Sequence, residues 1–153
     1  MDAITPAALV FTTNAPRAVV ESHGVTSPDA CLSGGETVFF PGTQPASLVL
    51  DFGEELVGVL ELTVEVEAAT TIELIAGEDL EEALLLKDPF PPDHWYHQPR
   101  DVLSLSPGSQ VARNQGRRAF RFVNLIVHGP GRLRLRQARM ILEHAPVSDL
   151  GAF

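Results

Sequence analysis

The chain has little of what most catalytic and metal-binding motifs require. Its 153 residues include a single cysteine, Cys31, so an internal disulfide and a cysteine-based metal site are both excluded. Cys31 stands in the stretch DACLSGGE, which has no recognisable nucleophile setting, and we interpret it as a small structural thiol. The sequence also contains no P-loop, G-x-S-x-G, H-E-x-x-H or glycine-rich dinucleotide fingerprint. We therefore predict no metal site and no cofactor.

Long apolar runs are absent as well. No stretch approaches the ~20 residues that a membrane-spanning helix needs, and no basic segment precedes the short apolar patch near the N-terminus, so no signal peptide or membrane partner is predicted. Localisation stays open, with the cytoplasm favoured over secretion. Hydrophobic residues make up 44% of the chain, which is typical of a globular protein. We expect residues 1–153 to form one domain.

Positive charge is scarce and is confined mainly to one part of the chain. The net charge is −9. Residues 51–93 contain thirteen acidic residues and one lysine, Lys87, whereas residues 113–139 contain eight arginines and no acidic residue. Because nucleic-acid-binding domains carry a basic surface and this domain is acidic, we predict no nucleic-acid partner. We expect the arginines to face the acidic strands of the same sheets, where each cross-strand pair contributes ~0.2–1 kcal/mol.

Apolar residues alternate with polar ones along much of the chain, which predicts half-buried strands. In ASLVLDF, Leu48, Leu50 and Phe52 share one face. The alternation resumes in GVLELTVEVE and TTIELIAGE, where the residues predicted to face inward are Leu60, Leu62, Val64, Val66, Ile72 and Leu74. In RRAFRFVNLIVHG it places Phe120 and Phe122 together on one face. With about eight to ten short strands and a turn every ~8–12 residues, the pattern predicts an all-β fold, an antiparallel jelly-roll-like β-sandwich with little helix.

The stretch PFPPDHWYHQPR, residues 89–100, contains four prolines in twelve residues. It is predicted to be a loop, because proline is excluded from helix interiors and central strands. His94 and His97 are too few for a zinc site, and a solvated loop is favoured. A second interpretation is carbohydrate binding, in which Trp95 and Tyr96 stack on a sugar ring. The polar partners of the sugar hydroxyls would then be Asp93 and Arg100.

Acidic residues at two turns offer candidate carboxylates. Asp51-Phe52-Gly53 is followed at once by Glu54 and Glu55, and a glycosidase needs two carboxyl groups ~5–9.5 Å apart. The favoured interpretation is structural, with Asp51 capping the turn, Phe52 in the core and Gly53 providing the turn backbone. GEDLEE, which contains Glu78, lacks the alternation of a calcium loop and is interpreted as a solvated acidic turn that leads into a helical turn or two.

Several of these motifs occur in an order that resembles one protein family. They are LVLDFGEELVGVLELTVE, TTIELIAGEDL, DVLSLSPG, RRAFRFVNLIVHG and a final GAF. The series resembles the accessory β-sandwich domain that precedes the catalytic domain of bacterial α-L-rhamnosidases, glycoside hydrolase family 78, and related proteins. The resemblance covers about residues 45–153, whereas residues 1–44 match poorly.

The resemblance implies that the catalytic carboxylates lie downstream, in an (α/α)6 barrel, and that none of them corresponds to a residue of this chain. The first hypothesis is therefore a non-catalytic accessory domain that packs on a downstream catalytic domain of the same polypeptide. The alternative is a carbohydrate-binding module that binds a glycan through aromatic residues of the 90–97 loop. A third hypothesis is a self-contained hydrolase that uses Asp51, Glu54 or Glu78. Exposed apolar surface on the isolated chain would also allow a homo-oligomer.

Overall fold

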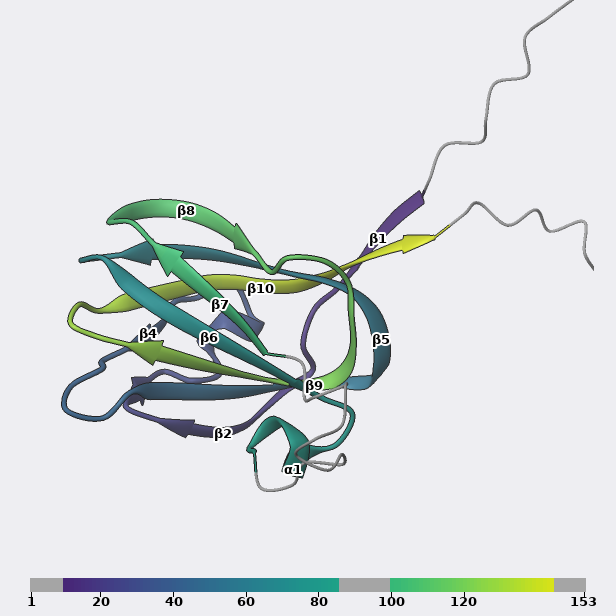
Figure 1. The fold of residues 1–153 in the computed structure, drawn as a ribbon, viewed down its shortest axis with the longest axis horizontal. Coiled ribbons are helices and arrows are strands. Elements are labelled where there is room, and N and C mark those ends of the chain that lie inside the picture. The colour runs from purple at the N-terminus through teal and green to yellow at the C-terminus, as the bar shows by residue number, and fades with distance from the viewer. Residues whose placement is uncertain (1–9, 86–99, 145–153) are drawn as a thin grey trace, which may run out of the picture.

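The computed structural model describes residues 10–85 and 100–144, which form ten strands and one short α-helix (Figure 1). The strands are β1 (Val10–Asn14), β2 (Ala18–His23), β3 (Val25–Thr26), β4 (Thr37–Phe39), β5 (Ala46–Val66), β6 (Thr70–Gly77), β7 (Arg100–Leu105), β8 (Gly108–Arg113), β9 (Arg118–His128) and β10 (Leu133–His144). The helix is α1 (Leu80–Ala83), and a 3-10 turn spans Ala30–Leu32. Within the described ranges, no helix is long and apolar enough to cross a membrane.

Strand β5 belongs to both layers of the sandwich and joins them. Residues 46–51 pair with β2 and β9, whereas residues 59–66 pair with β10 and β8. Between these segments the register with β9 shifts, from Asp51 opposite Phe122 to Leu56 opposite Phe120. Residues 56–58 still pair with β9, so the strand changes layer between Gly58 and Val59, beyond the Asp51-Phe52-Gly53 turn that interrupts its apolar alternation.

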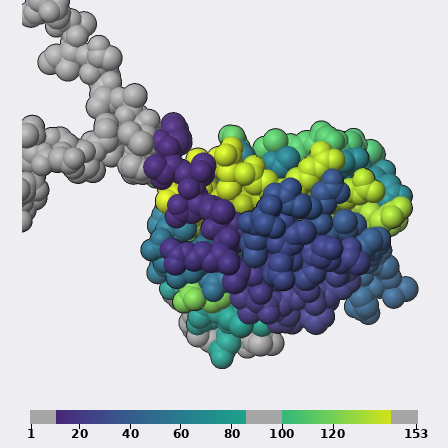
Figure 2. Space-filling model, turned by 180° about the vertical axis from the view of Figure 1, so that it is seen from behind, coloured from purple at the N-terminus to yellow at the C-terminus, as the bar shows by residue number. Residues whose placement is uncertain are grey.

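Each layer is antiparallel throughout. One layer has the order β3-β4-β10-β5-β8, with β1 added to the end of β10, and the other has the order β2-β5-β9-β6-β7. Figure 2 shows β1 and the end of β10 lying side by side at one end of the molecule. The predicted all-β, antiparallel sandwich with little helix is confirmed.

The space between the layers is filled by the apolar face of each strand. Leu60, Leu62 and Val64 of β5 are each 1% exposed, as the alternation predicts. Phe52 packs edge-on against Phe120, with ring centroids 5.7 Å apart and an interplanar angle of 77°. Burial of such side chains contributes ~1.5–3 kcal/mol each, so this core is the main source of stability.

Strand β9 departs from simple alternation. Phe120 and Val123 are both in the core, while Phe122 is only half-buried. The predicted pairing of Phe120 with Phe122 on one face is therefore wrong. The cause is the irregularity opposite the β5 turn, which inserts extra β5 residues against Arg121 and changes the phase of β9.

The outer face of the β2-β5-β9-β6-β7 layer carries helix α1, which packs on β6 and β9. Asn124 donates its side-chain N–H to the backbone carbonyl of Ala83 over 3.1 Å. A side chain at Gly77 would lie 2.6 Å from the backbone nitrogen of Ala83. Glycine at this position therefore allows the helix to contact the sheet directly.

Candidate functional site

The Asp51-Phe52-Gly53 turn is stabilised by the side chain of Asp51. The carboxylate of Asp51 accepts the backbone N–H of Gly53 over 2.7 Å, which is the geometry of an Asx turn. Gly53 has φ +84°, the left-handed region that glycine adopts without strain. The prediction that Asp51 caps this turn is confirmed.

Two arginines surround the same carboxylate. Arg121 of β9, next to the residue opposite Asp51, donates to both oxygens of Asp51 over 2.9 and 3.1 Å, and its guanidinium lies 4.8 Å from the ring centroid of Phe122. Arg17 packs over Gly53, where an added Cβ would lie 2.5 Å from its Cδ. The hydrogen bonds from Arg121 hold the pKa of Asp51 below its ordinary value. A general acid needs a raised pKa, so this environment does not suit Asp51 to that role.

Glu61 occupies a comparable position in the other layer. Its side chain is only 4% exposed and lies between two arginines, with the Nε of Arg113 at 2.7 Å and the Nε of Arg139 at 2.8 Å. Burial alone would raise the pKa of Glu61, but the hydrogen bonds from Arg113 and Arg139 outweigh it and the pKa is lowered. Glu61 therefore stays ionised at neutral pH and links the three neighbouring strands β8, β5 and β10.

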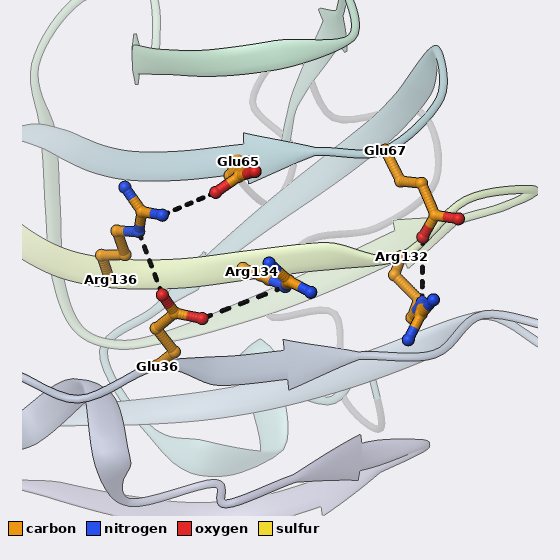
Figure 3. A network of polar contacts seen from close by, with 6 residues as sticks. All are labelled: Glu36, Glu65, Glu67, Arg132, Arg134 and Arg136. Atoms are coloured by element: carbon orange, nitrogen blue, oxygen red, sulfur yellow. Dashed lines mark hydrogen bonds and ion pairs between the residues drawn. The ribbon is translucent and has the colours of Figure 1, made fainter.

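Further along the same outer face, arginines and glutamates alternate across strands (Figure 3). Arg136 bridges Glu65 and Glu36, and Arg132 binds Glu67 over 2.9 Å. A hollow of about 140 Å³ lies among them, lined by Glu65, Glu67, Arg132 and Arg134. The prediction that the arginine run faces the acidic strands is confirmed, and the ion pairs leave this face without an open basic patch.

The remaining acidic candidates have ordinary structural roles or lie open to solvent. Glu54 is exposed. Asp79 caps α1 by accepting the backbone N–H of Glu82 over 2.9 Å, and Glu82 accepts the backbone N–H of Glu78 in return. Among the residues that the structure describes, no cluster of three or more histidine, cysteine or acidic side chains could hold a metal ion. GEDLEE is thus a helix cap.

Of the four predicted sugar-contacting residues, Asp93, Trp95 and Tyr96 lie outside the described residues. Arg100 begins β7 and is exposed, with its Nε 3.3 Å from the carboxylate of Glu73. The same carboxylate lies 2.6 Å from Nε2 of His128. Whether these residues form a site with the 90–97 loop stays a prediction.

A groove of about 480 Å³ runs between β7 and β8, where the two layers separate at one edge of the sandwich. Its lining combines apolar side chains with amide, hydroxyl and guanidinium groups: Val102, Leu103, Ser104, Leu105, Gln110, Val111, Ala112, Arg113 and Gln115.

A polar cluster next to this groove ties the two layers together. The carboxylate of Asp101 in β7 accepts hydrogen bonds from Nη2 and Nε of Arg118, over 3.0 and 3.2 Å. It also accepts a side-chain N–H of Asn114 over 3.4 Å. The amide oxygen of Asn114 in turn accepts the backbone N–H of Leu60. Sequence reasoning missed this cluster and also the partners of Asp51, because spacing along the chain does not reveal which strands are neighbours.

Cys31 is buried at the 3-10 turn, and its thiol lies 3.7 Å from the carbonyl oxygen of Pro28. Burial raises the pKa of this thiol, which suppresses the reactive thiolate at neutral pH. The interpretation of Cys31 as a structural residue agrees with this environment.

Among the described residues of this antiparallel β-sandwich, arginines bind seven carboxylates: Glu36, Asp51, Glu61, Glu65, Glu67, Glu73 and Asp101. The chain belongs to the family of the bacterial alpha-L-rhamnosidase concanavalin-like domain, whose model matches residues 42–141. The resemblance that the sequence motifs indicated is therefore confirmed. No curated protein sequence matches the chain.

Solved structures share the fold at low sequence identity. A rhamnosidase from Klebsiella oxytoca with rhamnose bound has a TM-score of 0.66 at 21% identity, over 90% of this chain and 30% of that chain. The GH78 family rhamnosidase of Bacillus sp. GL1 has a TM-score of 0.63 at 20% identity, over 82% of this chain and 13% of that chain. The chain thus spans less than a third of either relative.

A second group of similar folds consists of carbohydrate-binding modules. The CBM32 of AlyQ, in complex with 4,5-unsaturated mannuronic acid, has a TM-score of 0.55 at 9% identity, over 84% of this chain and 97% of that chain. At this identity the likeness shows a shared fold.

Proposed function

We propose that the chain is a non-catalytic accessory domain of a glycoside hydrolase of the α-L-rhamnosidase type, and that it packs on a catalytic domain of the same polypeptide. The observation that carries this proposal is the family match over residues 42–141, together with the 30% and 13% of the similar rhamnosidases that the chain spans. A domain of this kind stabilises its neighbour through an interface of about 600–1,500 Å².

The chemistry of the described carboxylates supports a non-catalytic role. Glycoside hydrolysis needs one carboxylic acid with a raised pKa beside a second carboxylate. Here arginines hold the pKa values of Asp51, Glu61 and Glu67 below their ordinary values.

Hydrolysis of an aryl α-L-rhamnoside by the chain of residues 1–153 and by its whole gene product tests the proposal. We expect no turnover by residues 1–153 and turnover by the whole gene product. Turnover by residues 1–153 that is lost in Asp51→Asn would overturn the proposal in favour of the self-contained hydrolase.

A second candidate function is carbohydrate binding, favoured by the fold that the chain shares with CBM32 modules. Under this hypothesis Trp95 and Tyr96 stack on a sugar ring while Asp93 and Arg100 hydrogen-bond to its hydroxyl groups. Each stacked ring of this kind contributes about 1 kcal/mol beyond its buried area.

Calorimetric titration with L-rhamnose and a panel of plant and bacterial oligosaccharides tests this second candidate. Saturable binding that disappears in Trp95→Ala would establish it. The matched control is Phe40→Ala, an exposed aromatic residue at the end of β4, and this variant should bind as well as the unmodified chain. Flat titrations across the panel would exclude carbohydrate binding for these sugars.

A further inference from the structure

One end of the outer face of the β3-β4-β10-β5-β8 layer is apolar. Phe11 of β1 is 61% exposed, and it lines a hollow of about 180 Å³ together with Val59 of β5 and Ile141 of β10. Val57 does not line the hollow but lies just before it along β5, at the end of the segment that pairs with β9, and is 55% exposed. We refer to Phe11, Val57, Val59 and Ile141 as the apolar end.

The apolar end contrasts with the rest of the same face. Where β5 and β10 continue away from it, outward positions carry Glu61 between Arg113 and Arg139, followed by the network of Figure 3. Paired charges make that part of the surface well suited to water. Large apolar side chains gathered at one end instead favour contact with another surface.

Arg113 and Arg117 line the same hollow, and Arg113 is already paired with Glu61. Each of the other arginines of residues 113–139 forms an ion pair with an acidic residue of this chain, whereas no ion pair or hydrogen bond joins Arg117 to any residue in the described part. A guanidinium beside an apolar hollow is suited to a carboxylate supplied from outside, because desolvation by the surrounding apolar groups strengthens such a pair.

The apolar end also lies where the described chain connects to its flanking sequence. Phe11 pairs in register with Glu143, and Thr13 with Ile141, so the first and last described strands run side by side to this end (Figures 1 and 2). A polypeptide segment attached at either side therefore starts beside the apolar end. Because the attached segment is held close to the apolar end, its effective concentration there is high, which favours binding at this surface.

We infer that the apolar end is the docking surface for the neighbouring domain of the same polypeptide, which inserts an apolar side chain into the hollow and presents a carboxylate to Arg117. This inference rests on the proposed function and specifies its interface. The face that the network of Figure 3 covers stays in water.

Hydrogen–deuterium exchange on residues 1–153 and on the whole gene product tests the inference. In the whole product we expect exchange to slow about tenfold or more in β1, at residues 57–59 and at residues 140–142, with no change in β7 or at residues 132–136. Protection confined to another face would overturn the inference and leave the proposed function standing. A gene product without a further domain would overturn both.

Point variants provide an independent test. Phe11→Ser and Arg117→Glu should each lower the Tm of the whole gene product by about 2–4 °C and leave the Tm of residues 1–153 unchanged. The matched control is Val102→Ser, at an equally exposed valine of β7 (59% exposed), which should change neither Tm. Equal losses in both proteins would overturn the inference. A dimer of residues 1–153 in light scattering, with β1 protected, would assign the surface to a second copy instead.

Discussion

At the scale of single residues, arginine is the main polar cross-link of this sandwich. Arg121 joins β9 to the turn of β5, Arg118 fixes Asp101, and Arg113 and Arg139 converge on Glu61. Their geometry matters because a planar guanidinium can donate to both oxygens of one carboxylate. Among the ion-paired carboxylates of the described residues, Glu61 and Asp101 are the least exposed, so they depend most on their partners.

Arg121→Ala should lower the free energy of unfolding at pH 7 by more than the control below, because it leaves the carboxylate of Asp51 without its bidentate partner. Urea denaturation followed by fluorescence or circular dichroism measures the change. Arg134→Ala is the matched control, since Arg134 is exposed and lies 3.9 Å from Glu36. The control should change stability by less than ~0.5 kcal/mol. An equal effect of the two variants would contradict the stabilising role of the pair between Arg121 and Asp51.

Glu61→Gln should have an effect that depends on pH. The pKa of Glu61 is lower in the folded chain than in the unfolded one, so its charge stabilises the fold fully above the unfolded value near ~4.3. That stabilisation is lost as pH falls through the lower folded-state pKa. We expect a loss of about 1–3 kcal/mol at pH 7 that shrinks towards zero in strong acid. Urea titrations of both proteins between pH 7 and about 2.5 would show this, and a loss independent of pH would contradict it.

Little of this residue-level chemistry could be read from the sequence. The charge blocks predicted that arginines face acidic strands, and the capping role of Asp51 followed from its place before Gly53. The identity of each partner did not follow, since Asp51 and Arg121 are separated by 70 positions and meet only through the register of β5 with β9. Arg17, which packs over the same turn, also gave no signal.

At the scale of elements, β5 determines how the layers fit together. Where it approaches β10, a side chain on Gly58 would lie 2.3 Å from the carbonyl oxygen of Ile141. The backbone of β10 cannot move away without breaking its pairing with β5. Glycine at this position therefore permits the close approach of the two strands.

Gly58→Ala should destabilise the chain by about 2–3 kcal/mol, because the added methyl group overlaps backbone atoms. Thermal unfolding would report this as a lowered Tm. Gly42→Ala is the control, since nothing lies within 4 Å of a Cβ at that position, and it should leave the Tm nearly unchanged. Similar Tm values for the two variants would contradict the close approach.

Element prediction succeeded where alternation is regular and failed where it is not. The inward residues of the second half of β5, and Ile72 and Leu74 of β6, were predicted correctly. Strand β8 was missed because GSQVAR has no alternating apolar pattern, and it is a strand through pairing with β5. The change of layer within β5 was also missed, because no local signal distinguishes a bend inside one strand from a turn between two.

At the scale of the whole molecule, the charge arrangement determines which partners the surface can attract. The net charge of −9 and the pairing of the arginine run leave little unbalanced positive potential.

Predicting the sandwich required only periodicity and turn residues, whereas predicting the sugar-contacting residues required knowledge of loop geometry that the sequence does not contain. Of those residues, the structure describes Arg100 alone.

The chain should not bind polyanions. Counterion release requires several unpaired cations on one surface, and here most arginines already have carboxylate partners. On a heparin column we expect the chain in the flow-through at about 0.15 M NaCl. Retention beyond about 0.3 M NaCl would show that the ion pairs of Figure 3 open to expose a basic surface.

The antiparallel pairing of β1 with the end of β10 has a consequence for mechanical load. Tension that pulls these neighbouring strands apart acts along their hydrogen bonds, which lie perpendicular to the strands, and so it opens them one pair at a time. Peeling of β1 from β10 needs little force for this reason. The tension then reaches β10 where it pairs with β5, the strand shared by both layers. Under load the chain would therefore first release a short β1 arm as slack, while the rest of the sandwich resists as a single body.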